Sequence, residues 1–383
     1  MTKDADTLFK YLVAGLIEAA ETDFRYPYPP LWQQALNMLT AFQIRHRTPI
    51  PNTLTGTLAL LEEPIGEWWP GELPEAVTAE LDQDFTLLFG GQPDDWAYEF
   101  LESEGVAGMA TLAQFQDEIT QTGMKRLRDL YRSNADTLGY VYVVTRRFIV
   151  ENPVTTLANI QQTLGNLPLI RLKQVADFYE AEDEFLNEAL HQGQFWRCPH
   201  CQSILNWVDG TPRCERHSVC GRLTSGYRAC KLLAPTGNLL RLKPSMVRRV
   251  CVPGLPEVEL YDWAKNLQTA NSGLVSVFLW PGVDRYDLQL CFADNTSWAI
   301  DVKDYADPIN LGRRVSSQSF YNLGQLRWDQ GYYVFPQYRV DWNKNYVELF
   351  NRAAELSIQV KGVSEVDFKN LVIRKLAQLT EDA

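Results

Sequence analysis

Residues 284–304 read DRYDLQLCFADNTSWAIDVKD, and this stretch predicts a β-hairpin. Apolar and polar side chains alternate from residue 286 to 292 and again from 297 to 303, with the period of two that strands require. The four residues between them, Ala-Asp-Asn-Thr at 293–296, tolerate turn geometry. We therefore expect two antiparallel strands joined by a tight turn.

Two carboxylates and an amine of this hairpin form a candidate metal site. Asp287 opens the first strand and Asp301 lies near the end of the second, so both can meet at one edge, with Lys303 on the same side as Asp301. Two carboxylates suit Mg²⁺, which keeps several waters, and a neighbouring lysine can orient a metal-bound water. The alternative is an exposed Asp301–Lys303 ion pair that contributes little.

Composition and charge define the broad class of protein. The chain has 383 residues, 45% hydrophobic and 22% charged, as expected for a globular protein of two or three domains. The net charge is −12, but it is unevenly distributed: residues 1–100 carry −11 and residues 212–250 carry +8. This asymmetry favours a local basic surface on an otherwise acidic protein.

The sequence favours a cytoplasmic protein. It has no apolar run long enough for a membrane span, and its first residues lack the basic-then-apolar pattern of a secretory signal. Four of its seven cysteines fall within residues 198–220, which favours a metal site in a reducing compartment over a disulfide framework.

Residues 1–190 are expected to form a mostly helical, acidic domain that docks a protein partner. The segment 49–74 is rich in Pro and Gly, which predicts loops or short helices. Helical periodicity follows in residues 115–132, 140–150, 153–164 and 169–190. The last two could resemble a helix-turn-helix, but an ordinary helical hairpin is favoured.

Residues 191–235 are expected to form a zinc ribbon with a basic stretch. Cys198 and Cys201 form a C-x2-C pair, and Cys214 and Cys220 follow at the distance of a second pair, with a strand and turn between them. Tetrahedral Zn²⁺ with four thiolates fits this spacing and makes a structural rather than a catalytic site. His217 could replace one of the second two cysteines, and free buried cysteines are the alternative to a metal.

Basic residues continue beyond the cysteines and form a candidate nucleic-acid-binding surface. Such a patch neutralises phosphates with little dependence on sequence. The alternative is a solvated face that pairs with the acidic N-terminal domain. The candidate residues are Arg222, Arg228, Lys231, Arg241, Lys243, Arg248 and Arg249.

Residues 236–383 are expected to form an α/β domain with a mixed sheet. A helix at 256–267 and a strand at 274–280 precede the hairpin. A helix at 310–327, a strand at 331–335, a helix at 342–356, a strand at 358–360 and a helix at 364–379 follow it, the last with Ser364 as N-cap. The fold class is thus α+β and multidomain.

This order, with Asp287, a 13-residue gap, and then Asp301-Val302-Lys303, resembles the restriction-endonuclease-like superfamily and its PD-(D/E)xK signature. The resemblance implies a mixed sheet flanked by helices and metal-dependent phosphodiester hydrolysis. It further implies that both aspartates and the Val302 carbonyl bind Mg²⁺ or Mn²⁺ and that Lys303 positions the attacking water. The preceding helix supplies a further acidic residue in many members, here Glu259 or Glu257. Asp284 is an alternative first ligand.

The whole layout is similar to nuclease components of prokaryotic defence islands, and in particular to the nuclease encoded beside PIWI-RE proteins. This resemblance implies an endonuclease acting on nucleic acid, DNA above all, in anti-phage or anti-plasmid defence, with a helicase or Argonaute-like partner. A homodimer is compatible with it. The alternative function is a non-catalytic, zinc-containing nucleic-acid-binding or adaptor subunit of a larger complex.

Overall fold

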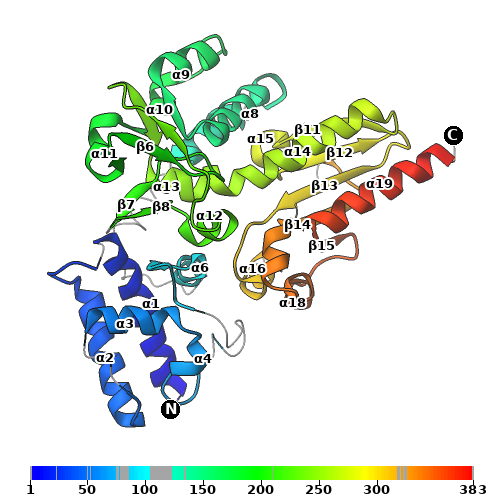
Figure 1. The fold of residues 1–383 in the computed structure, drawn as a ribbon. Helices are drawn as coiled ribbons and strands as arrows, with labels where there is room; N and C mark the ends of the chain where they lie inside the picture. Colours follow the sequence, from blue (N-terminus) through cyan, green and yellow to red (C-terminus); the bar gives the residue numbers. More distant parts are fainter. Residues whose placement is uncertain are drawn as a thin grey trace.

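A five-stranded mixed β-sheet forms the centre of the C-terminal region (Figure 1). The computed structural model describes residues 2–22, 24–49, 51, 53–74, 77, 86–103, 123–132, 135–208, 210–316, 320, 322 and 326–381. Neighbouring strands are antiparallel across β11-β12-β13 and parallel across β13-β14-β15. The strands are β11 (Leu274–Leu279), β12 (Leu288–Phe292), β13 (Ser297–Val302), β14 (Gln330–Phe335) and β15 (Val360–Ser364).

The two faces of this sheet bury alternate residues of the same strands. Trp298 and Ile300 of β13 lie in one apolar core, and Ala299, between them in the sequence, lies in a second core on the opposite face. The first face packs against α14 (Val252–Ala270) and α19 (Glu365–Glu381), and the second against α16 (Pro308–Ser316) and α18 (Tyr346–Ala353).

Two strand boundaries predicted from the sequence are wrong. Strand β12 begins at Leu288 instead of Tyr286, because the Tyr286 ring packs in the core of the α16 and α18 face. Strand β15 begins where the predicted strand ends, and Ile358 is fully exposed. Gly362 lies in the middle of β15, and a Cβ there would collide with the Phe350 ring, so the close packing of α18 requires glycine.

The helix boundaries also differ from the prediction. The helix expected at 342–356 is the shorter α18, because α17 (Gln337–Trp342) ends at 342 and the backbone at Asn343 is extended. Helix α14 starts at Val252, before the predicted start at residue 256, and ends at Ala270. The helix expected at 310–327 spans 308–316, and 317–319, 321 and 323–325 lie outside the described residues. The Ser364 cap is confirmed, since its hydroxyl accepts a hydrogen bond from the Asp367 amide at 3.0 Å.

The cysteine-containing segment forms a small module of short strands and one helix. Its elements, here called the cysteine module, are β5 (Leu190–His191), β6 (Gln194–Arg197), β7 (Asn206–Val208), β8 (Thr211–Arg213), α12 (His217–Leu223) and β9 (Lys231–Leu233). Strands β7 and β8 pair as the hairpin expected between the two cysteine pairs. Of the second pair, Cys214 follows this hairpin directly and Cys220 lies in α12, so one of the four cysteines is on a helix.

The segment before the module is partly stranded. The helix expected at 169–190 is instead α10 (Leu172–Ala176), β4 (Tyr179–Ala181) and α11 (Glu182–Ala189). Strand β4 and β3 (Val154–Thr156) flank β10 (Leu239–Leu242) in a three-stranded sheet, so this segment is tied to the chain beyond the cysteine module. The predicted helices at 140–150 and 153–164 correspond to α8 (Ala135–Glu151) and α9 (Leu157–Leu164). Of the helix expected at 115–132, the described part, 123–132, is helical.

The first hundred residues form a helical region with its own core (Figure 1). Phe9, Trp32, Trp96 and Phe100 are fully or almost fully buried in it. The expected short helices at 49–74 are present. The elements are α1 (Thr2–Glu21), α2 (Pro30–His46), α3 (Leu54–Glu62), α4 (Ile65–Trp68), the hairpin β1 (Leu88–Phe89) and β2 (Gln92–Pro93), and α6 (Asp95–Ser103).

The architecture is therefore the predicted α+β arrangement: helical N-terminal elements, a four-cysteine cluster and a C-terminal mixed sheet. Within the described part of the chain, no helix is long and apolar enough to cross a membrane.

A buried ionic quartet joins these three parts. Arg216, at the start of α12, contacts Asp95 of α6 and donates to Asp304 at 2.9 Å. Arg339 of α17 donates to Asp304 at 2.6 Å and to Asp95 at 3.1 Å. All four side chains are nearly inaccessible to water. Each charge has partners of opposite sign, as buried charges require.

Helix α6 also binds the loop that follows β13. The Glu99 carboxylate accepts hydrogen bonds from the amides of Ala306 and Asp307 at 2.9 to 3.2 Å, and Trp96 donates to the Asp307 carboxylate at 3.1 Å. Burial raises the pKa of Glu99 to about 8, although the Arg339 guanidinium and the two amides oppose the shift. The helical region is thus bound directly to the end of a central strand.

The raised pKa of Glu99 predicts a specific pH dependence of stability. Between the ordinary value of 4.5 and about 8, the folded protein holds a proton that the unfolded chain has lost. The contribution of Glu99 to the free energy of unfolding is fully present below pH 4.5. It falls by about 1.4 kcal/mol for each pH unit as the pH rises to about 8. Because glutamine does not titrate, we expect Glu99→Gln to flatten the pH dependence of the free energy of unfolding, measured by urea denaturation. Equal slopes in both proteins over this range would contradict it.

Candidate functional site

Strands β12 and β13 bring Asp287 and Asp301 to the same end of the hairpin. Their paired register ends at Leu288 and Ile300, and the Asp287 amide also donates to the Ile300 carbonyl at 3.0 Å, so Asp287 is not paired directly with Asp301. The Asp301 carboxylate is nevertheless close enough to raise the pKa of Asp287. The predicted convergence of these two residues at one end of the hairpin agrees with this placement.

Asp287 is a buried carboxylate among other acids. One of its oxygens accepts a hydrogen bond from the Val302 amide at 2.7 Å. Burial and the nearby carboxylates of Glu257 and Asp301 raise its pKa well above the ordinary value, against the opposing charges of Lys303 and Arg146. A further positive charge beside Asp287 would offset this repulsion and favour the ionised form.

Lys303 lies directly against Asp301, with its Nζ 2.8 Å from a carboxylate oxygen. Burial opposes the charge on the amine, but the Asp301 and Asp287 carboxylates outweigh it and raise the pKa of Lys303. The lysine is therefore a fixed cation at the end of β13. The ion pair is partly buried rather than fully solvent-exposed.

Glu257 of α14 is the helix carboxylate that reaches this site. It accepts from Arg146 at 2.8 and 3.1 Å and from the Trp280 indole at 2.5 Å. Arg146 also contacts Asp284 and lies 4.3 Å from the Trp280 ring centroid. Asp284 has further partners, including the Tyr142 hydroxyl at 3.1 Å. Arg146, from α8, thus binds two acidic side chains of the C-terminal region.

Glu259, the other acidic candidate of this helix, lies elsewhere. Its side chain is exposed, and its nearest charged groups are Glu365 and Lys369 of α19. A helix places residues two positions apart on different faces. The structure therefore brings Glu257, not Glu259, to Asp287 and Asp301.

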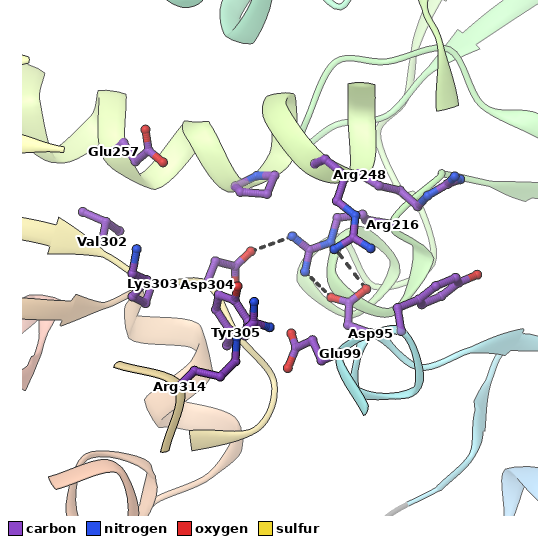
Figure 2. A pocket seen from close by; sticks show the side chains of 13 residues that line it. Asp95, Glu99, Arg216, Arg248, Glu257, Val302, Lys303, Asp304, Tyr305 and Arg314 are labelled. Atoms are coloured by element: carbon purple, nitrogen blue, oxygen red, sulfur yellow. Dashed lines mark hydrogen bonds and ion pairs between the residues drawn. The ribbon is translucent and has the colours of Figure 1, made fainter. Parts of the chain in front are cut away.

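A pocket of about 320 Å³ opens beside these residues. Figure 2 shows Glu257, Val302 and Lys303 on one side of it and Asp95 and Glu99 of α6 on the other. Arginines from three elements line it as well: Arg216, Arg248, Arg249 and Arg314. Arg248 and Arg249 lie in a π-helical turn, η1 (Val247–Cys251), which leads into α14. The pocket combines carboxylates with several cations, as a site for a phosphate group and a metal ion requires.

The remaining basic candidates are distributed differently. Arg222 donates to Asp94 at 3.1 Å, so it pairs with the acidic N-terminal region, as in the alternative interpretation of the basic stretch. Arg241 is buried and its guanidinium is bound by Glu180, Glu188 and Asn206, which leaves it no access to nucleic acid. The exposed ones are Arg228, Lys231 and Lys243.

The four predicted cysteines come together. Cys198, Cys201, Cys214 and Cys220 are buried, and their sulfur atoms all lie within 4.8 Å of one another. Four thiols this close, with no disulfide among them, are a donor set that suits a tetrahedral metal ion such as zinc. The cluster could therefore hold a metal.

His217 supports this cluster from outside. Its Nδ1 lies 2.6 Å from the Tyr227 hydroxyl, which accepts a hydrogen bond from the Cys214 amide at 3.0 Å. Burial, together with Arg213 and Arg222, lowers the pKa of His217 to about 4, so it is neutral. The four-cysteine set is thus complete without the histidine, which positions Tyr227.

The carboxylate site differs from the thiol cluster in its geometry. Among the described residues, the four cysteines are the one group of three or more ligand atoms from His, Cys, Asp or Glu drawn this close together. Asp301 is bound to Lys303, and Glu257 to Arg146. A divalent ion would have two strand carboxylates and a backbone carbonyl here, which fits Mg²⁺ because it retains waters.

Comparison with known families supports a protein of a pPIWI_RE island. Residues 254–380 match the family model described as "REase associating with pPIWI_RE", and residues 8–156 match "pPIWI_RE three-gene island domain Y". No curated protein and no solved structure matches the chain. The predicted likeness to the nuclease encoded beside PIWI-RE proteins agrees with these matches. The PD-(D/E)xK fold and the zinc ribbon remain predictions.

The sequence analysis missed two contributions to the site. Arg146 belongs to the segment that matches domain Y, and Glu257 to the segment that matches the REase model, so the two regions meet at this ion pair. Asp95 and Glu99 of α6 also line the pocket. Neither contribution has a local sequence motif. In both cases the residues lie more than 100 positions along the chain from the residues they meet, so the sequence pattern does not predict the contact.

Arg146 gives a stability prediction with a matched neighbour. Arg146→Met leaves the buried Glu257 and the partly buried Asp284 without their shared cation, and we expect a loss of about 3 kcal/mol in the free energy of unfolding. Arg147→Met removes only more exposed pairs with Glu151 and Asp262, and should cost about 1 kcal/mol or less. Urea denaturation of both variants checks this. Equal losses would contradict the role assigned to Arg146.

Proposed function

We propose that this protein is the metal-dependent nuclease of a pPIWI_RE island, hydrolysing phosphodiester bonds, in DNA above all, as part of a prokaryotic defence system. The observation that carries the proposal is the cluster of Asp287, Asp301 and Lys303 at one end of the hairpin, beside a pocket lined by arginines. The family matches at residues 254–380 and 8–156 support the same interpretation.

The residues around the pocket have separate roles in this proposal. Asp287, Asp301 and the Val302 carbonyl would hold Mg²⁺ or Mn²⁺, which when bound supplies a Lewis acid for the phosphate and lowers the pKa of a water. Lys303, fixed by Asp301, orients the attacking water towards phosphorus. Arg248, Arg249 and Arg314 place positive charge next to the phosphate.

Glu257 sets the charge at the back of the site. Arg146 and Trp280 hold its carboxylate in one orientation, where it disfavours further negative charge on Asp287. A divalent cation relieves this repulsion, and its binding is thereby coupled to ionisation of Asp287. The family resemblance implies a further acidic residue on the preceding helix, either Glu257 or Glu259. We propose that this residue is Glu257.

The cysteine cluster is proposed to bind one Zn²⁺ with a structural role. Its four thiolates would complete the coordination shell, which leaves no open position for a substrate. It holds α12, and with it Arg216 and Arg222, against the N-terminal helical region. A proposed partner, an Argonaute-like protein or helicase of the island, would bind the acidic N-terminal region.

The test is cleavage of plasmid and single-stranded DNA and RNA with Mg²⁺ or Mn²⁺. We expect metal-dependent cutting by the wild type, none by Asp301→Ala, and a loss of about 100-fold or more for Lys303→Ala. Glu257→Gln should be impaired, whereas Glu259→Gln, changed on another face of the same helix, should cut like the wild type.

Wild-type cutting by a folded Asp301→Ala protein would contradict the proposal. A second outcome would favour the non-catalytic subunit instead. In it, the protein binds nucleic acid in a salt-dependent manner but does not cut it with any divalent ion, even when the island's other proteins are added.

The zinc proposal predicts one equivalent of Zn²⁺ per chain in elemental analysis of the purified protein. Cys201→Ser should lose the metal and lower the melting temperature, because the thiolates would no longer close the cluster. Cys291→Ser removes a partly buried cysteine outside the cluster and should retain the full equivalent. A metal-free wild type with unchanged stability would contradict it.

A further inference from the structure

A second and larger pocket lies where all three parts of the chain meet. Its volume is about 770 Å³, within the range of about 300–1,000 Å³ typical of sites for small organic groups. The β1–β2 hairpin, the start of α6, Arg222 of α12, the loop after β13 and the end of α17 all contribute to its walls. Nothing in the proposed hydrolysis uses this pocket.

Its walls carry flat, π-bearing groups. The Arg222 guanidinium lies 4.4 Å from the Phe89 ring centroid and 5.4 Å from that of Trp342. Asp94 holds Arg222 at 3.1 Å, and Arg339 lies 5.5 Å from the Trp342 ring. Aromatic rings and guanidinium planes of this kind are the surfaces on which proteins stack unpaired nucleobases.

Trp342 is the exposed aromatic residue of the lining. It is 38% exposed, and in the described part of the chain it is the one exposed tryptophan. Trp32, Trp96 and Trp280, by contrast, are at most 1% exposed. Arg222, Arg339 and the Tyr338 ring contact part of the Trp342 ring, and a bound partner that covers the exposed remainder would be stabilised by its burial.

The two pockets share a wall. Asp95 lines the catalytic pocket, whereas its neighbours Asp94 and Trp96 line the second. Likewise the loop after β13 contributes residues 304–305 to the first pocket and 306–308 to the second. A group bound in the second pocket is therefore next to the site where a phosphate is cut.

The charge of the second pocket selects the part of a nucleotide that enters. Glu62, Asp94 and Asp307 line it together with Arg222, Arg339 and Lys344, so its charges balance. Arg222 and Arg339 are already bound to carboxylates, whereas in the first pocket the cations outnumber the carboxylates. This division suits a strand whose phosphate lies in the first pocket while a neutral base enters the second.

We propose that the second pocket binds the base of an unpaired nucleotide next to the cleaved phosphate, stacked on Trp342. The location relative to cleavage rests on the proposed nuclease function, but the base site itself does not. A base in a duplex is stacked and paired, so the pocket selects single strands or a nucleotide turned out of a helix.

The experiment measures stacking without cleavage. Short single-stranded DNA and RNA oligonucleotides carrying 2-aminopurine are titrated with the full-length protein in EDTA, and the fluorescence is followed. We expect quenching on binding to the wild type and to Trp342→Phe. Trp342→Leu, which keeps bulk but has no ring, should lose the quenching and bind about tenfold more weakly. The same label in a duplex should be quenched less.

Phe278→Ala is the matched control, because Phe278 is 49% exposed on β11 and does not line the pocket, and it should behave like the wild type. Circular dichroism and thermal melting confirm that each variant is folded. Equal affinity and quenching in Trp342→Leu and the wild type would overturn the base site, as would the absence of binding to any oligonucleotide. Trp342-dependent quenching in a protein that never cuts would support the base site and contradict the nuclease.

Discussion

The arrangement of the whole molecule depends on two arginines and two aspartates that pair in its interior. Asp95, Arg216, Asp304 and Arg339 come from four elements in three parts of the chain, and each charge is neutralised by the others. Charges buried this deeply are tolerated only while all partners are present, so the quartet resists any separation of the helical region, the cysteine module and the sheet. It also forms the wall between the two pockets.

Opposite net charges also help to hold the acidic N-terminal region against the basic cysteine module. The strongly acidic first hundred residues meet the basic stretch of the cysteine module through Asp94–Arg222 and Asp95–Arg216. Part of the positive charge that the sequence pattern assigns to nucleic acid is therefore used within the protein. Arg248, Arg249 and Arg314 line the first pocket, although Arg248 also donates to Glu215 at 3.1 Å.

Four carboxylates and two cations form a cluster beside the first pocket. The carboxylates are those of Glu257, Asp284, Asp287 and Asp301, and the cations are Arg146 and Lys303. Burial, and then the negative charges of Glu257 and Asp301, raise the pKa of Asp287. A divalent cation would offset the repulsion among these carboxylates. Because Arg146, which binds Glu257, comes from α8, metal binding would also depend on the position of α8.

Features with a local signal could be predicted from the sequence, and features made by distant contacts could not. The alternation of residues around the hairpin predicted β12, β13 and the meeting of Asp287 and Asp301, and the spacing of four cysteines predicted their cluster. Strand β15 was misplaced because its residues, VKGVS, are half polar and contain a glycine that only the packing of Phe350 explains. Which of Glu257 and Glu259 reaches the site depends on which face of α14 is turned towards the sheet. The contact of Arg146 with Glu257 depends on how α8 packs.

Crystals soaked in MnCl₂ would show whether the Asp287–Asp301 pair is, as we propose, a divalent metal centre. An anomalous difference map recorded near the manganese absorption edge should show a peak between the two carboxylates and the Val302 carbonyl in the wild-type protein, and none in Asp301→Ala. A wild-type map with no peak at this position, in crystals whose site is open to solvent, would contradict the claim.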